Sequence, residues 1–377
     1  MKIAVNTRLL MPGKLDGIGW FTYETLQRIV TSHPEHTFYF IFDRPYSKEV
    51  IFAENVVPII LRPPTRRPFL WYIWFEIRIP GLLRRLNADL FLSTDGFVSL
   101  RSDVPSCSVM HDINFEHRPQ DVPYFVRKYY RYFYPRYAHK ATRLATVSEY
   151  SRRDIINTYD IDENKIDLVY NGASKKFRPI DDEKVTDVRA KYSNGAPYFI
   201  FVGSLHPRKN IKNLLRAFEL FREEYRNPFK LIIVGQKFFL TRQMEDQLEA
   251  MTHRDDVIFT GRLSPDELND VLAASWAMTF VPFFEGFGIP LVEAMHCDIP
   301  VVASKVTSLP EIAGDAAVYV EPESPGSIRD GMIRIVKDEG LREELILKGR
   351  ERRLLFSWDN TAQELWKTIE RTVGTDA

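Results

Sequence analysis

Two glutamates, Glu285 and Glu293, lie eight residues apart around a glycine-rich loop. The apolar run 276–283 predicts a buried strand before the loop, and Pro290 suits the first turn of a helix, where its missing N–H is not needed. A turn that opens a helix presents free backbone N–H groups to an anion such as a diphosphate. Carboxylates do not bind phosphate, so the pair implies hydroxyl-bearing parts of a ligand, such as a sugar ring and a ribose. For either glutamate alone, a helix cap or a solvated helix face is the alternative.

A pair of cations follows another predicted strand, residues 198–202, which ends at Gly203. Arg208 and Lys209 immediately precede a helix expected to begin at about Asn210. Two cations at a helix start oppose its dipole, which predicts that they bind a diphosphate. A solvated pair is the alternative.

His111 ends the predicted strand 107–111, a position from which a side chain can reach a ligand. An isolated histidine is more often structural, but the strand end favours a functional role, and Asp112 is expected to orient the ring. Near the N-terminus, Gly17 and Gly19 lie before a helix predicted to reach about residue 31. They lack the third glycine of a dinucleotide-binding fingerprint, so alone they are weak evidence.

Length and composition predict a globular chain of two domains, because 377 residues exceed what one hydrophobic core usually supports. With 45% hydrophobic and 13% aromatic residues, the chain is not expected to be disordered. Only Cys107 and Cys297 are present, which excludes a disulfide framework and favours a reducing, cytoplasmic setting. No segment is long and apolar enough for a membrane span.

The charge is asymmetric, although the chain is neutral as a whole. Residues 1–180 carry 26 Lys and Arg against 19 Asp and Glu, which leaves 25 against 32 for the remainder. Basic residues alternate with aromatic ones in the segments 62–85 and 124–143. The pattern suits peripheral contact with the inner face of a membrane, whereas aromatic core helices with snorkelling arginines are the alternative. No nucleic-acid-binding module accompanies it, so nucleic acid is not an expected partner.

Apolar runs alternate with helical patterns, which predicts an α/β chain with two doubly wound parallel sheets. A polar connector is expected at 173–195, which divides a domain 1–180 from a domain 181–355. Residues 356–377 form a final helix. The first strands are expected at 2–7, 37–43, 56–62, 89–93, 107–111, 144–148 and 165–169, and the later ones at 198–202, 229–234, 257–260, 278–282, 300–303 and 318–320.

The Glu-x7-Glu pattern resembles the signature of the retaining glycosyltransferases of family 4, also called glycosyl transferases group 1. That resemblance implies the GT-B fold, with two Rossmann-like domains facing a cleft and the final helix crossing back to the N-terminal domain. It implies that Glu285 lies near the donor sugar and that Glu293 holds the nucleotide ribose. The other roles it implies are a sugar and phosphate lining from the backbone of Phe287, Gly288 and Ile289, a donor-facing loop at Gly17 and Gly19, a donor-facing His111, a phosphate site at Gly203 and Lys209 with Arg208 as a replacement arginine, and a nucleotide-base site at Gly261, Arg262 and Leu263.

The resemblance further implies transfer of a hexose, with a lean toward mannose, from a UDP- or GDP-sugar to a glycan or lipid-linked acceptor in polysaccharide assembly. No cofactor and no metal ion are expected, because cations and helix dipoles would stabilise the leaving diphosphate. The chain has no P-loop, no zinc-binding pair of histidines and no Gly-x-Ser-x-Gly elbow. A nucleotide-sugar epimerase of similar fold, a noncatalytic sugar-nucleotide sensor and a membrane scaffold are the alternatives.

Overall fold

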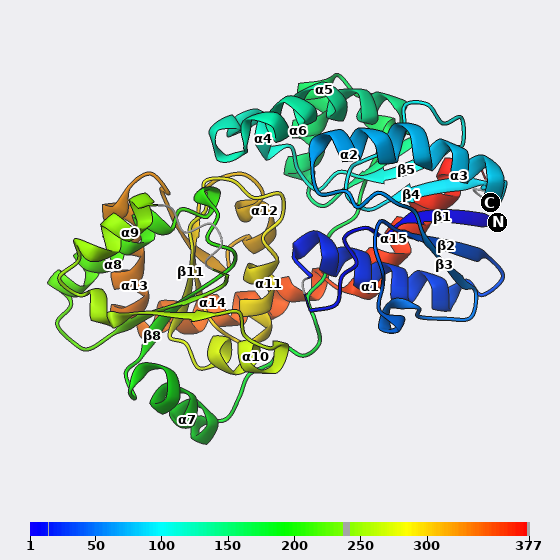
Figure 1. Cartoon of the computed structure of the whole chain (residues 1–377). Coiled ribbons are helices and arrows are strands. Elements are labelled where there is room, and N and C mark those ends of the chain that lie inside the picture. Colours follow the sequence, from blue (N-terminus) through cyan, green and yellow to red (C-terminus); the bar gives the residue numbers. More distant parts are fainter. Residues whose placement is uncertain (14, 237–241, 375–377) are drawn as a thin grey trace. The chain divides into compact units, whose positions relative to one another are not determined.

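The computed structural model describes residues 1–13, 15–236 and 242–374. The chain divides into two compact units, Met1–Gly172 with Ser357–Ala377, and Ala173–Phe356. Each unit is built on one sheet whose paired strands are all parallel, and helices cover the sheets (Figure 1). This confirms the predicted α/β class with two doubly wound sheets.

The first sheet has seven strands in the order β3-β2-β1-β4-β5-β6-β7. Strand β1 lies between β2 and β4, so Val5 is paired with Phe40 on one side and with Leu92 on the other. The inner strands are almost wholly buried, as continuous apolar runs in a parallel sheet require. The strands are β1 (Lys2–Asn6), β2 (Thr37–Phe42), β3 (Val56–Ile60), β4 (Leu90–Ser93), β5 (Ser106–Val109), β6 (Arg143–Thr146) and β7 (Ile166–Leu168).

Helices pack on both faces of this sheet, with α2, α3 and α5 on one side and α1 on the other (Figure 1). The helix α15 packs along α1 and against β4, β5 and β6, so the last described residues belong to the first unit. The helices are α1 (Gly17–Ser32), α2 (Pro68–Tyr72), a π-helix (Ile73–Arg78), α3 (Ile79–Leu86), α4 (Asn114–His117), α5 (Tyr124–Lys140), α6 (Glu149–Tyr159) and α15 (Trp358–Val373).

Aromatic residues of the two basic segments divide between core and surface. Trp74 and Phe75 are buried, and the Trp74 indole donates to the carbonyl of Leu61 at 2.7 Å. Tyr137 is also fully buried. In contrast, 75% of the Phe125 surface is exposed. The core interpretation of these segments therefore holds for some of their aromatic residues and fails for others.

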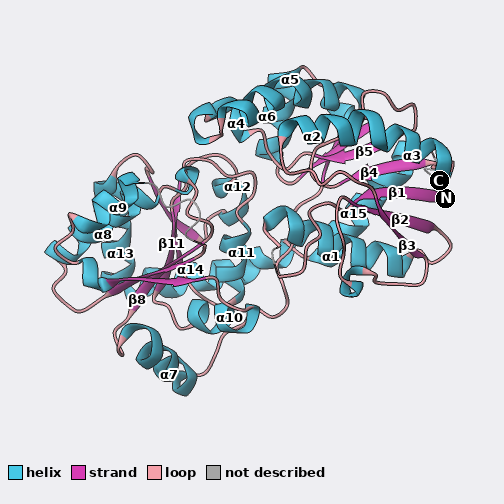
Figure 2. Ribbon diagram, viewed as in Figure 1, coloured by secondary structure: helices cyan, strands magenta, loops and turns pink. Residues whose placement is uncertain are grey.

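The second sheet has six strands in the order β10-β9-β8-β11-β12-β13. Figure 2 labels two of them, β8 and β11, among the helices of the second unit. The order reverses between β8 and β11, and ligands of such sheets bind beyond the carboxyl ends of the strands at this reversal. The strands are β8 (Tyr198–Val202), β9 (Lys230–Val234), β10 (Val257–Gly261), β11 (Ala277–Phe280), β12 (Val301–Ser304) and β13 (Ala317–Val320). The helices are α7 (Asp182–Ser193), α8 (Ile211–Glu224), α9 (Arg242–Glu249), α10 (Pro265–Ala273), α11 (Ile289–His296), α12 (Leu309–Ala313), α13 (Pro325–Lys337) and α14 (Glu339–Arg352).

The segment 173–195, expected as a polar connector, contains the helix α7, which the sequence patterns did not predict. Asp181 caps this helix by accepting the N–H of Lys184 at 2.8 Å, and Asn194 ends it in the left-handed region. Only Val188 and Ser193 are buried among the helical residues. A helix with so narrow a buried face has little apolar periodicity, which is why the segment resembles a linker.

Across residues 1–13, 15–236 and 242–374, the helices all fall short of the length and apolar character that crossing a bilayer requires.

Candidate functional site

The loop between β11 and α11 has the predicted construction. Gly288 adopts a left-handed backbone (φ 99°) and precedes the first helical residue, Ile289, with Pro290 in the first turn. The left-handed backbone favours glycine, and a Cβ atom there would lie 2.7 Å from the end of the Leu309 side chain, which would have to shift. The Ser308 hydroxyl lies 2.9 Å from the Glu285 carbonyl and donates to it. These contacts fix the backbone that carries Glu285.

Arg208 and Lys209 lie in a single 3-10 turn, Pro207–Lys209, between β8 and α8. The Arg208 guanidinium donates to Glu285 Oε1 at 2.9 Å and to the carbonyl of Phe284 at 3.1 Å. The Lys209 ammonium donates to the same Glu285 oxygen. Because β8 and β11 are neighbours in the sheet, the loops after them bring these three side chains together at the strand reversal.

The electrostatics of Glu285 follow from these two partners. Burial disfavours the charged carboxylate, but the Arg208 and Lys209 charges and their hydrogen bonds outweigh it and lower the pKa of Glu285. Glu285 and Lys209 expose only 7% and 8% of their surfaces. Glu285 is thus an ionised carboxylate held in one place, where it can accept hydrogen bonds from a ligand's hydroxyl groups.

Glu293 lies inside α11, and its carboxylate differs from that of Glu285 in its partners and in its pKa. Its side chain is half-buried, and within the described part of the chain its carboxylate has no hydrogen bond and no ion pair. Burial alone raises the pKa of Glu293 to about 7. A ligand that brings hydrogen-bond donors to this carboxylate is bound more tightly, because it relieves the cost of a buried acceptor without a partner.

Glycines end three adjacent strands at the same edge of the second sheet. The Gly203 N–H donates to Val234 at 2.9 Å, and the Gly235 N–H donates to Gly261 at 3.0 Å. A Cβ atom at Gly235 would lie 1.8 Å from the Gly203 carbonyl oxygen, which leaves no room for a side chain. The strand ends can therefore approach one another, and a ligand, more closely than side chains would allow.

In the first unit, His111 follows β5 and its Nε2 donates to the Thr94 carbonyl at 2.9 Å. Its ring also meets Phe21 edge-on at 4.9 Å. Burial lowers the pKa of His111, so the imidazole is neutral at pH 7 and its Nδ1 is an acceptor. Asp112 does not orient the ring as expected, because its carboxylate instead accepts from the backbone N–H of Asn114 at 3.0 Å.

Two sequence families match successive parts of the chain. Glycosyltransferase Family 4 matches residues 15–176, and Glycosyl transferases group 1 matches residues 184–352. Both family models describe glycosyltransferases, and together they match most of the chain. The chain therefore belongs to the glycosyltransferases that these two models describe.

Relatives and solved structures agree with that membership. The glycosyltransferase is 31% identical over 221 residues to O-antigen chain mannosyltransferase B of Escherichia coli, a match that spans 58% of each chain. It is 26% identical over 282 residues to O-antigen chain mannosyltransferase RfbU of Salmonella typhimurium, covering 74% of each chain. The structure of Anabaena Alr3699/HepE in complex with UDP and glucose superposes with a TM-score of 0.77 at 16% identity and covers 98% of this chain and 99% of that one. That structural likeness confirms the GT-B fold.

The remaining predicted site residues of the glycosyltransferase lie at element ends. Gly17 and Gly19 form the first turn of α1, where Asp16 caps the helix by accepting the Gly19 N–H at 2.9 Å. Gly261 ends β10 with a left-handed backbone (φ 73°), and a Cβ atom added there would meet no other atom within 4 Å. The next residues are the exposed Arg262 and the half-buried Leu263, before the predicted capping box of Ser264, which is confirmed.

Phe287 is buried and packs edge-on against Phe356, so its side chain serves the core whatever its backbone binds.

Asn210 is a positioning residue that the sequence patterns missed. It has a left-handed backbone (φ 62°), and its amide donates to the carbonyls of Val281 at 2.9 Å and Pro322 at 2.7 Å. These bonds tie the turn that carries Lys209 to the segment after β11 that carries Glu285. The available signal was an asparagine directly before a helix, where it tolerates the left-handed conformation.

Proposed function

We propose that this glycosyltransferase moves a hexose, with mannose favoured, from a UDP- or GDP-linked donor to a glycan or lipid-linked acceptor. The observation that carries the proposal is the contrast between Glu285 and Glu293 in one loop and helix. Glu285 is ionised and held by two cations, whereas Glu293 is half-buried without a partner in the described residues. The mannosyltransferase names of the relatives support the choice of sugar.

In this proposal each group has a separate task. Glu293 accepts the hydroxyl hydrogens of the ribose, and Glu285 accepts those of the donor sugar. Arg208 and Lys209 stabilise the diphosphate as it leaves, and the N-terminus of α11 adds its dipole. The backbone at Gly203 and at Gly261 to Leu263 lines the phosphates and the base.

We further propose that the anomeric configuration is retained without an enzyme nucleophile and without a catalytic metal ion. The acceptor hydroxyl attacks from the face that the diphosphate leaves, and a donor phosphate oxygen takes the hydroxyl proton. The bond to the new acceptor oxygen forms as the bond to the phosphate oxygen breaks, so no atom is left over. His111 Nδ1 accepts a hydrogen bond from a sugar hydroxyl, which orients the sugar ring for this step.

The test is an assay of UDP-glucose, UDP-galactose and GDP-mannose with lipid-linked glycan acceptors, read by product mass and by proton NMR of the anomeric centre. Glu293→Gln should weaken donor binding at least tenfold, and Glu323→Gln, which changes an exposed glutamate of the same unit, should not. Transfer with an inverted centre would contradict retention. Epimerisation of a free donor, or donor binding with no transfer, would replace the proposal with an epimerase or a sensor.

We also propose that the first unit contacts an anionic membrane surface. Several apolar side chains on α2, the π-helix and α5 are more than half exposed, namely Phe69, Ile77, Tyr124, Phe125 and Tyr132. Cations lie over two of these rings, with Lys128 Nζ 4.7 Å from the Tyr124 centroid and the Arg136 guanidinium 3.8 Å from that of Tyr132. Rings beside cations suit the headgroup region of a bilayer.

Vesicle sedimentation tests this contact. Binding should be stronger to phosphatidylglycerol-containing vesicles than to phosphatidylcholine vesicles, and Phe125→Ser should weaken it. Leu354→Ser, which alters an equally exposed apolar residue of the second unit, is the matched control. Equal binding of the wild type to both vesicle types, or no loss in Phe125→Ser, would contradict the contact.

A further inference from the structure

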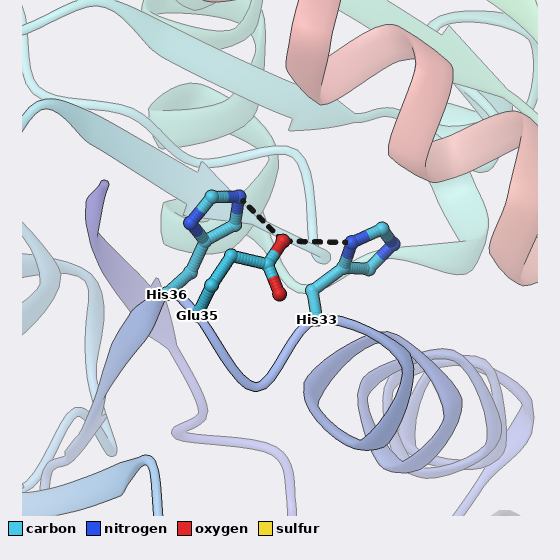
Figure 3. Close-up of side chains that lie close together, drawn as sticks. All are labelled: His33, Glu35 and His36. Carbon is cyan, nitrogen blue, oxygen red and sulfur yellow. Dashed lines mark ion pairs between the residues drawn. The ribbon is translucent and has the colours of Figure 1, made fainter.

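Three potential metal ligands converge in the turn between α1 and β2. His33 Nδ1 lies 3.4 Å from Glu35 Oε1, and His36 Nε2 lies 3.3 Å from the same oxygen (Figure 3). One ligand atom from each residue falls within 4.8 Å of the others. Figure 3 shows the carboxylate between the two imidazole rings, with both facing nitrogens directed toward it.

These separations match the spacing around a small divalent ion. Zinc bonds to imidazole nitrogen and carboxylate oxygen are about 2.0–2.1 Å long, so neighbouring ligand atoms of a tetrahedral site lie about 3.3–3.4 Å apart. The two nitrogen–oxygen separations already have this length. Two histidines and one glutamate leave a fourth position for water.

The turn is held in shape by groups outside the cluster. The Asn55 amide donates to the carbonyls of Val30, His33 and His36 at 3.0–3.1 Å. The His33 ring stacks on Trp366 of α15 with centroids 3.6 Å apart. The backbone and one ligand ring are therefore fixed before any ion binds, which lowers the entropy cost of binding.

We propose that His33, Glu35 and His36 bind one divalent transition metal ion of the zinc class. The site lies immediately before β2, at the amino edge of the first sheet, whereas His111 follows β5 at the carboxyl edge. The ion would brace the α1–β2 turn against α15 and would take no part in sugar transfer. Sequence patterns missed the site because they search for paired histidines on one helix, and these ligands occupy a turn.

Isothermal titration of Zn²⁺ into tag-free, chelator-treated protein at pH 7.5 tests the proposal. The wild type should bind one ion and melt at a higher temperature with it, since binding to the native state alone stabilises that state. Glu35→Gln and His36→Gln should each weaken binding about tenfold or more. Glu35 has 58% of its side chain exposed, so its variant should remain folded.

His117→Gln is the matched control, because this exposed histidine lies 2.8 Å from the carboxylate of Asp154. It should bind Zn²⁺ as the wild type does. No saturable binding to the wild type would overturn the proposal, and so would wild-type affinity in either Glu35→Gln or His36→Gln. Donor binding should be unchanged in Glu35→Gln, which separates this site from the transfer site.

Discussion

Lys209 and Glu285, which are 76 positions apart in the sequence, form a buried ion pair beyond the adjacent strands β8 and β11. Arg208 shares the same carboxylate oxygen. The pair joins the two loops at the reversal of strand order, so it assembles the candidate site and also holds the two loops together. Removal of either partner should therefore affect both binding and folding.

Lys209→Met tests that double role. We expect a loss of about 2–3 kcal/mol in the free energy of unfolding, because Glu285 stays buried with one cation instead of two. The pKa of Glu285 should rise, and donor affinity should fall. Urea denaturation of Lys209→Met, Glu285→Gln and the double variant measures the coupling. Additive losses would mean that the two side chains contribute to stability independently. Lys348→Met, which breaks an exposed ion pair with Glu344, is the control and should change the free energy of unfolding little.

Glu293→Gln should make the protein more stable above neutral pH although it weakens donor binding. A carboxyl whose pKa is raised from 4.5 to about 7 by folding holds a proton in the native state that the unfolded chain has lost. The unfolding free energy therefore falls as pH rises through 4.5 to 7, by about 1–3 kcal/mol from this group. Chemical denaturation at pH 4.5 and pH 8 measures the difference between wild type and variant.

That difference isolates Glu293, because other groups titrate equally in both proteins. Glu323→Gln should follow the wild-type pH dependence. A constant difference between wild type and Glu293→Gln across this range would show that Glu293 keeps an ordinary pKa. Donor affinity should also rise from pH 6 to pH 8 in the wild type, since ribose hydroxyls donate to the ionised form.

Local patterns were enough to predict the strands, because most of them are apolar runs that end in a turn. The strand β8, expected at 198–202, is observed at Tyr198–Val202, and the loop after β11 has the predicted glycine and proline roles. The helix α7 was missed because it buries little of its surface. Polar helices of this kind are stabilised by caps such as Asp181, which a turn pattern can equally explain.

Contacts between distant positions could not be predicted from spacing. Arg208 and Lys209 were expected to need an anion, and the structure supplies Glu285, a residue the sequence placed in a separate role. The bond from His111 to the Thr94 carbonyl was likewise hidden, because it depends on how β4 and β5 lie side by side. An adjacent carboxylate such as Asp112 was the only partner visible in the sequence.

Gly235→Ala should destabilise the second unit strongly. The added Cβ would overlap the Gly203 carbonyl oxygen, which belongs to the backbone and cannot rotate away. We expect a loss of about 3 kcal/mol or more, together with weaker nucleotide binding as the strand ends move apart. Thermal melting with and without UDP or GDP measures both effects. Gly326→Ala is the control, because the nearest atom to its added Cβ would be 3.8 Å away. This variant should be as stable as the wild type or slightly more stable. Equal melting temperatures of the two variants would contradict the prediction.

His111→Gln should lower the turnover rate about 10–100-fold with a smaller change in donor KM. The glutamine can still donate to the Thr94 carbonyl, but it does not place an acceptor where His111 Nδ1 lies. Burial lowers the pKa of His111 below its ordinary 6.5, so the ring is neutral throughout the range from pH 7 to pH 9 and should add no ionisation to the rate profile there. Steady-state kinetics at several pH values measures these effects. His139→Gln, at an exposed position of the same unit, is the control and should leave the turnover rate unchanged. If His111→Gln changed the donor KM more than the turnover rate, His111 would act in ground-state binding instead.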